Sequence, residues 1–133
     1  MSEEASFKTR GEKFEKGLAT RRAVLGPDYV DNNINNADEF TWPMQKLVTE
    51  FCWDEIWNRP GLDRRSRSVL NLGMISALNR PHELKVHIRG AIANGLSKAE
   101  IQEILLQVAC YCGMPAGVDG FRIAREVFAE MKI

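Results

Sequence analysis

Apolar residues recur every three or four positions along most of this 133-residue chain, and no segment shows sustained alternation. That spacing is typical of amphipathic helices, whose side chains three and four residues apart share a face. The pattern therefore predicts an all-α protein of about six helices joined by short turns. A chain of this length can bury one core, so residues 1–133 are expected to form a single domain.

Turn residues divide the first half of the helical pattern. A charged amphipathic helix is expected to end at Gly26 and Pro27, where the glycine and proline interrupt the periodicity. A polar stretch over residues 31–36 separates it from a second helix, which Asp38 could cap. This second helix is expected to end near residues 57–61.

Capping residues mark the helices of the second half. Asp63 is the expected N-cap of a third helix, and residues 69–78 within it are apolar on almost every face, which predicts a central buried helix. Pro81 opens a fourth helix. Ser97 and Glu100 have the spacing of a capping box ahead of a fifth. A last amphipathic segment completes the predicted set.

The charge balance narrows the classes of partner. Lysine and arginine together number 18, as do aspartate and glutamate, and the isoelectric point of about 6.7 shows no strong bias. Nucleic acid and anionic membranes are therefore not expected partners. The N-terminal sequence is charged and lacks an apolar run, so neither a signal peptide nor a transmembrane span is expected. These features favour a cytoplasmic protein.

Cysteine spacing argues against redox or metal chemistry. Cys110 and Cys112 form a CxC pair rather than the CxxC of thiol–disulfide exchange, and buried, inert thiols are the expected state. With Cys52 they are too few for a disulfide framework. Glu83, His87, His82 and a cysteine are candidate metal ligands, but the residue spacing of known metal sites is missing, so no metal is predicted.

Glu83 and His87 are the leading candidates for chemistry. They are four residues apart on the fourth predicted helix, so their side chains share one face. Histidine titrates near neutral pH, and a neighbouring carboxylate can hold its tautomer or charge, which suits proton transfer. The pair lies at the border of the apolar face that Leu84 and Ile88 define. The alternative is an ordinary surface pair without catalytic function.

Arginines provide a second indication. Arg64, Arg65 and Arg67 occupy the first turns of the third helix, where the positive end of the helix dipole disfavours cations. Arg80 stands just before the helix of Glu83, where it could reach an anion held at that N-terminus. An anionic ligand would compensate these charges, because arginine grips carboxylates through two hydrogen bonds. The alternative is compensation by neighbouring carboxylates: Asp54, Glu55 and Asp63.

Several segments, taken in their order along the chain, resemble the carboxymuconolactone decarboxylase family. They are RRAVLG, FCWDEIW, RPGLDRRSRS, NRPHELKVHIRGAIANG and SKAEIQEILLQVACYCGMPA, with the core of the match over residues 62–115. The resemblance implies a helical fold of the alkylhydroperoxidase D type, assembled as a homo-oligomer, a hexamer or trimer. It also implies decarboxylation of 4-carboxymuconolactone to 3-oxoadipate enol-lactone and CO2, in protocatechuate breakdown by the β-ketoadipate pathway.

The wider superfamily indicates what this chain has lost. Its alkylhydroperoxidase members carry CxxC and, four residues later, a histidine that corresponds to His87. The two cysteine positions are Arg80 and Glu83 here. The peroxide-linked disulfide chemistry therefore lacks its sulfur at that place. A thiol-dependent peroxidase or disulfide reductase that uses the other cysteines, and a non-catalytic helical paralogue, remain as alternatives.

The implied reaction assigns roles to the candidate residues. The electrons left by CO2 delocalise onto the lactone carbonyl, so neither a cofactor nor a metal is required. The protein must grip two carboxylates, stabilise an oxyanion and deliver a proton. His87 would donate or orient the proton, and Glu83 would set its tautomer or exchange the proton itself. Carboxylate or oxyanion contacts would come from Arg64, Arg67 and Arg80, with a further hydrogen bond from Tyr111 unless it is a buried structural tyrosine.

Overall fold

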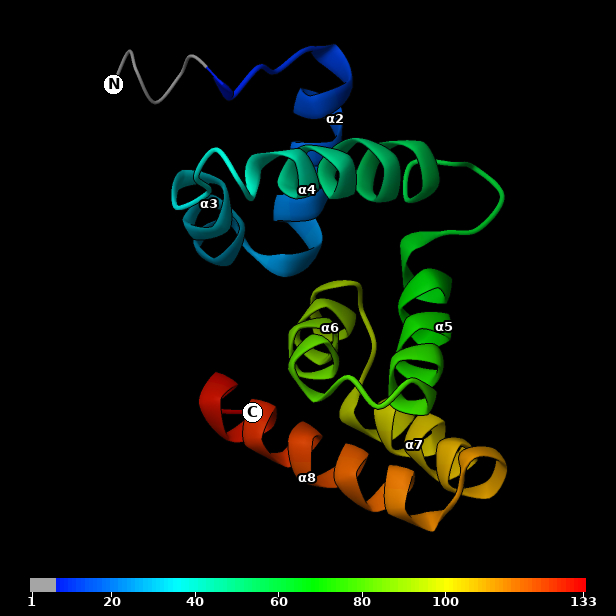
Figure 1. The fold of residues 1–133 in the computed structure, drawn as a ribbon. Helices are drawn as coiled ribbons and strands as arrows, with labels where there is room; N and C mark the ends of the chain where they lie inside the picture. The colour runs from blue at the N-terminus through cyan, green and yellow to red at the C-terminus, as the bar shows by residue number, and fades with distance from the viewer. Residues whose placement is uncertain (1–6) are drawn as a thin grey trace. The chain divides into compact units, whose positions relative to one another are not determined.

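The computed structural model describes residues 7–133, and every regular element in that range is a helix (Figure 1). The expected all-α class is thus confirmed. The chain forms two compact units, which divide after Gly61. The first unit contains α2 (Glu12–Leu25), α3 (Pro27–Asn35), α4 (Trp42–Leu47) and the π-helix η1 (Val48–Ile56). The second contains α5 (Arg64–Ala77), α6 (Pro81–Ala93), α7 (Lys98–Cys112) and α8 (Met114–Met131).

Close contact between α2 and η1 organises the first unit. A Cβ atom on Gly17 of α2 would overlap the carbonyl oxygen of Thr49 in η1, so only glycine allows this approach. Phe14 packs on Trp42 with ring centroids 5.3 Å apart, and Trp53 stacks on Trp57 at 4.6 Å. Aromatic side chains therefore supply much of the apolar burial in this unit.

Two expectations for the first unit were wrong. The polar stretch over residues 31–36 is mostly helical, because α3 buries Val30 and Ile34 on its inner face. Asp38 does not cap α4. Its carboxylate instead accepts a 2.9 Å hydrogen bond from the backbone N–H of Thr41, which is itself the N-cap position. A tight turn thus precedes the helix.

Small residues on α8 bring α7 close in the second unit. A Cβ atom on Gly117 would overlap Ala109, and one on Gly120 would overlap the side chain of Leu105. The core that these helices share with α5 and α6 consists of fully buried aliphatic side chains. Among them are Leu72, Ile88, Ile101, Leu105 and Val127.

The helix α5 is only partly buried, contrary to the expectation for residues 69–78. Leu72 is fully buried, but Leu70 and Met74 are about half exposed and Leu78 is 65% exposed. The described residues therefore cover the apolar side chains on the outer face of α5 only in part. Within residues 7–133, none of the helices combines the length and apolarity needed to cross a bilayer.

The predicted caps of the second unit are confirmed. The carboxylate of Asp63 accepts a 2.7 Å hydrogen bond from the backbone N–H of Ser66. The hydroxyl of Ser97 accepts from the backbone N–H of Glu100, and the Glu100 carboxylate accepts from that of Ser97, at 3.1 and 2.9 Å. These reciprocal bonds fix where α5 and α7 begin.

Candidate active site

The junction between α5 and α6 fixes the backbone of Arg80 from both sides. Asn79 adopts a left-handed conformation with φ of 57°, which asparagine tolerates better than most residues. The N–H of Asn79 donates to the carbonyl of Ser76, and the N–H of Arg80 donates to that of Ile75, at 3.2 and 3.3 Å. This is the Schellman pattern at a helix C-terminus. The carbonyl of Arg80 then accepts from Leu84 and begins α6.

The side chain of Arg80 borders a hollow of about 190 Å³ between the end of α5, the start of α6 and the start of α8. We call it the Arg80 hollow, and its polar lining comes from Ser76, Asn79, Arg80 and Asp119. The guanidinium of Arg80 is exposed, and it donates two long hydrogen bonds, 3.4 and 3.5 Å, to the carbonyls of Leu78 and Asn79. No carboxylate of the described residues forms an ion pair with it.

Glu83 and His87 occupy successive turns of α6 on the side of Arg80. Pro81 begins the helix as predicted, and spacings of three and four residues place Arg80, Glu83 and His87 along one stripe. Glu83 is exposed and His87 is half-buried. Burial lowers the pKa of His87 below its ordinary value, and the Glu83 carboxylate opposes this by raising it. The imidazole is therefore biased toward its neutral form in the free protein.

Nearby groups already engage part of the arginine cluster on α5. Arg65 forms an ion pair with Glu100, a partner that sequence reasoning missed. Two of the three expected compensating carboxylates bind elsewhere: Glu55 pairs with Lys13 at 3.1 Å, and Asp54 accepts a 3.0 Å hydrogen bond from Asn58.

Arg64 and Arg67 lie on α5 at the far end of its contact with α6. Arg64 is exposed and Arg67 is half-buried. The side-chain amide of Asn94 donates to the carbonyl of Arg64 and to the hydroxyl of Ser68, at 3.3 and 2.8 Å. These bonds join the first turn of α5 to the last residues of α6, so the two helices run antiparallel. Neither arginine lines the Arg80 hollow.

Tyr111 lies in a different place from the stripe on α6. It is 80% exposed, so the alternative of a buried structural tyrosine is wrong for the single chain. It borders an apolar hollow of about 590 Å³ between α5 and α7, together with Val69, Leu70 and Met74. The structure therefore does not bring Tyr111 together with Arg80.

The cysteines also differ from expectation. Cys110 and Cys112 are exposed rather than buried. Cys52 is half-buried, and burial raises the pKa of its thiol, which disfavours the reactive thiolate. Within the described range, no group of three or more histidine, cysteine, aspartate or glutamate side chains has an arrangement that could hold a metal ion.

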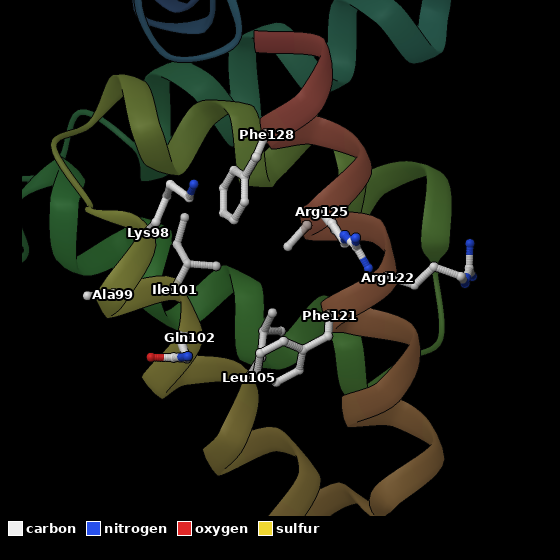
Figure 2. A pocket seen from close by; sticks show the side chains of 10 residues that line it. Lys98, Ala99, Ile101, Gln102, Leu105, Phe121, Arg122, Arg125 and Phe128 are labelled. Atoms are coloured by element: carbon white, nitrogen blue, oxygen red, sulfur yellow. The ribbon is translucent and has the colours of Figure 1, made fainter. Parts of the chain in front are cut away.

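A further hollow contains none of the candidate residues. It has a volume of about 660 Å³ and lies between α7 and α8. Figure 2 shows Phe128 of α8 facing Ile101 of α7 across it, while Arg122 points away. The ammonium of Lys98 lies 5.1 Å from the ring centroid of Phe128. This lining is apolar with a cationic rim and offers no acid–base pair.

Ser76 is the residue that sequence reasoning missed. It is 7% exposed and lines the Arg80 hollow, and its hydroxyl has no hydrogen-bond partner in the described part of the chain. Its position four residues before Arg80 could have drawn attention to it. Nothing in a sequence, however, distinguishes a serine hydroxyl that is satisfied from one that is not.

Comparison with known proteins identifies the family of this chain. The chain is 43% identical over 118 residues to nitrosuccinic acid decarboxylase of Metarhizium robertsii, covering 89% of this chain and 82% of the relative. It is 35% identical over 122 residues to 4-carboxymuconolactone decarboxylase of Acinetobacter baylyi, covering 92% and 91%. Both relatives are named decarboxylases, which supports the expectation of a decarboxylase enzyme. The model of the carboxymuconolactone decarboxylase family matches residues 43–126. This chain belongs to the carboxymuconolactone decarboxylase family.

Proposed function

We propose that this enzyme decarboxylates a small dicarboxylic acid, and that 4-carboxymuconolactone is its first candidate substrate. The products would be 3-oxoadipate enol-lactone and CO2, as in protocatechuate breakdown. The observation that carries the proposal is the stripe of Arg80, Glu83 and His87 on α6 in a member of this family. It combines a cation for a carboxylate with an acid–base pair for a proton.

The substrates named for the two relatives share one chemical feature. Each carries two carboxylic acid groups, and the carbon that loses CO2 is conjugated or attached to an oxygen-bearing acceptor. In the lactone the electron pair reaches the carbonyl oxygen and gives a dienolate. In nitrosuccinate it reaches the nitro oxygens and gives a nitronate. Both substrates thus supply their own electron sink, and the enzyme needs to hold the anion and return a proton.

The proton step follows from the environment of His87. Cleavage of the carbon–carboxylate bond leaves its electron pair on the substrate, and a proton from the imidazolium then forms the new C–H bond. The neutral imidazole regains its proton from solvent, directly or through Glu83. Burial biases His87 toward the neutral form in the free enzyme. A bound dianion adds negative charge nearby and raises this pKa, so the substrate itself promotes formation of the acid.

A second candidate substrate is nitrosuccinate. The identity to the nitrosuccinic acid decarboxylase is 43%, against 35% to the lactone decarboxylase, over similar shares of the chain. Its reaction would use the same stripe, because a nitronate places the negative charge on two oxygens much as an enolate does. A preference for this substrate would reflect differences in how the acceptor end is held.

Release of CO2 tests the proposal directly. Purified full-length enzyme is incubated with each substrate in the presence of a metal chelator and a thiol-blocking reagent, and CO2 and product are measured. We expect turnover of one of them. We also expect His87→Asn to lose at least about a hundredfold in kcat while its circular dichroism is unchanged. Turnover of neither substrate by folded protein would overturn the proposal, and loss of activity on thiol blocking would favour the thiol-dependent alternative.

We further propose that the enzyme works as a homo-oligomer. The support is the exposed apolar surface of α5 and α7, where Leu70 and Met74 are each about half exposed and Tyr111 is 80% exposed. Such a surface is larger than single scattered residues would give and favours burial against a second copy. Light scattering on the purified protein would give the assembly mass, and Leu70→Glu is expected to reduce it. A monomeric wild-type protein would contradict this.

A further inference from the structure

We propose that the Arg80 hollow is a carboxylate subsite, with Ser76 as a substrate-binding residue that holds the carboxylate the reaction retains. The proposal rests on the proposed function only in taking a dicarboxylate as substrate. Its geometry comes from three independent features of the hollow: an unsatisfied buried hydroxyl, a cation without an ion pair, and two helix N-termini.

The hydroxyl of Ser76 is the most informative of these features. A buried hydroxyl without a hydrogen-bond partner is costly, because folding removes it from water without replacement. Ser76 is only 7% exposed, and no partner is found for it among residues 7–133. A carboxylate in the hollow would accept a hydrogen bond from this group. Binding would then remove the energetic cost of leaving the Ser76 hydroxyl without a hydrogen bond.

The two helix N-termini add positive electrostatic potential. The first turn of α6 contributes Pro81 to the lining, and the first turn of α8 contributes Pro115 and Ala116. Neither helix has a side-chain cap within the described structure. The first backbone N–H groups of each helix thus lack the side-chain acceptor that a cap residue would provide. Helix N-termini of this kind favour anions, through both the free N–H groups and the helix dipole.

The guanidinium of Arg80 completes the subsite. Its contacts to the carbonyls of Leu78 and Asn79 are at the long end of the range, so a carboxylate can displace them. A hollow of about 190 Å³ accommodates a carboxylate and the carbon that bears it. Glu83 and His87 do not line the hollow but follow on the next turns of α6, so a substrate held at Arg80 would extend along α6 to reach the acid–base pair.

Asp119 is the one anionic group that lines the hollow. Its carboxylate is more than half exposed and lies 3.7 Å from the guanidinium of Arg122, which offsets part of its charge. An anion in the hollow would still be repelled by it, whereas a cation would be attracted. Removal of this charge therefore has opposite effects on the two kinds of ligand.

Isothermal titration calorimetry with succinate, a dicarboxylate without the acceptor group, tests the subsite apart from turnover. We expect Ser76→Ala and Arg80→Gln each to weaken succinate binding about tenfold. Asp119→Asn should strengthen it. Arg125→Gln removes an exposed arginine of α8 that lines the hollow between α7 and α8, and it should leave the affinity for succinate unchanged. In NMR spectra, succinate should shift the backbone amides of His82 and Ala116.

The stability of Ser76→Ala separates a binding role from a structural one. Removal of an unsatisfied hydroxyl should leave the melting temperature of the free protein unchanged or higher. A clear fall would mean that the hydroxyl supports the fold, and it would overturn the proposal. Unchanged affinity in Ser76→Ala and Arg80→Gln, weaker binding in Asp119→Asn, or no succinate binding by the wild type would overturn it as well. Succinate binding with this pattern, without turnover of either substrate, would leave the subsite intact and remove the proposed reaction.

Discussion

The Glu83 carboxylate acts on the pKa of His87 in the opposite direction to burial. The carboxylate, one turn earlier on α6, raises the pKa of the imidazole, while burial lowers it by a larger amount. The net effect favours the neutral form of His87 beside an anionic neighbour. A histidine balanced in this way responds strongly to any further charge.

We expect Glu83→Gln to lower the pKa of His87 further, because the variant removes the charge that favours the imidazolium. The imidazole C–H resonances in an NMR pH titration measure this directly. Glu103→Gln changes an exposed carboxylate of α7 and serves as the matched control. An unchanged or higher pKa in Glu83→Gln would show that the carboxylate does not act on this ring.

Stability should depend on pH through His87. Its pKa in the folded protein lies below the ordinary value of 6.5, so between those two values the unfolded chain binds more protons. Stability therefore rises with pH in that window, is fully recovered above about 6.5, and falls as the pH drops through the folded pKa. Urea unfolding at several pH values measures the slope. His87→Asn should reduce it, and His82→Asn, at an exposed position, should not.

Asn79 should tolerate glycine and reject valine. Both the Schellman bonds and the position of Arg80 require φ of 57° at this residue. Glycine adopts that conformation freely, whereas a β-branched residue is strained there by about 1–2 kcal/mol. Asn79→Val is expected to lower the melting temperature and to raise KM for the substrate. Equal behaviour of Asn79→Gly and Asn79→Val would mean that the turn geometry does not matter.

Gly17→Ala should destabilise the first unit. The added methyl group would overlap the carbonyl of Thr49, and relief requires a backbone shift that costs about 1–3 kcal/mol. Gly73→Ala is the control, since no atom beyond its chain neighbours and the backbone of its own helix lies within 4 Å of its Cβ position, and alanine favours a helix by about 1 kcal/mol. Urea unfolding followed by circular dichroism should show a lower free energy of unfolding for Gly17→Ala and a higher one for Gly73→Ala. A stabilising Gly17→Ala would contradict the close approach of α2 and η1.

Arg21 is expected to be dispensable for folding. It is 5% exposed and donates to Gln45 and Thr49, at 2.9 and 3.2 Å, but no ion pair to a carboxylate of the described residues compensates its charge. Burial lowers its pKa. Replacement by an apolar side chain of similar volume is often neutral or stabilising at such positions. The free energy of unfolding of Arg21→Met should therefore lie within about 1 kcal/mol of the wild-type value. Arg21→Ala should be less stable because it also leaves a void.

Sequence patterns predicted the second unit better than the first. Asp63, Pro81, Ser97 and Glu100 each act locally, through hydrogen bonds or ring geometry within one turn, so their effect can be read from spacing alone. The π-helical hydrogen bonds of η1, such as Trp57 N–H to the Cys52 carbonyl at 3.0 Å, depend instead on packing against α2. No spacing of residues in the sequence predicts these hydrogen bonds.

The site shows the same division. The register of Glu83 and His87 on one helix face follows from their spacing. The burial that lowers the pKa of His87, the ion pair of Arg65 with Glu100 and the unsatisfied hydroxyl of Ser76 do not. Each depends on which helix packs against which, and this information is distributed over the whole unit.

The backbone of Arg80 belongs to two helices at once, as the last bonded position of α5 and the N-cap of α6. Its Cα atom is therefore held before any ligand arrives, and binding need only select among side-chain rotamers. An arginine on a free loop would lose backbone freedom as well, at roughly 1–2 kcal/mol for each residue that becomes ordered. Because the bend between the helices already orders the backbone of Arg80, the entropic cost of binding an anion there is lower.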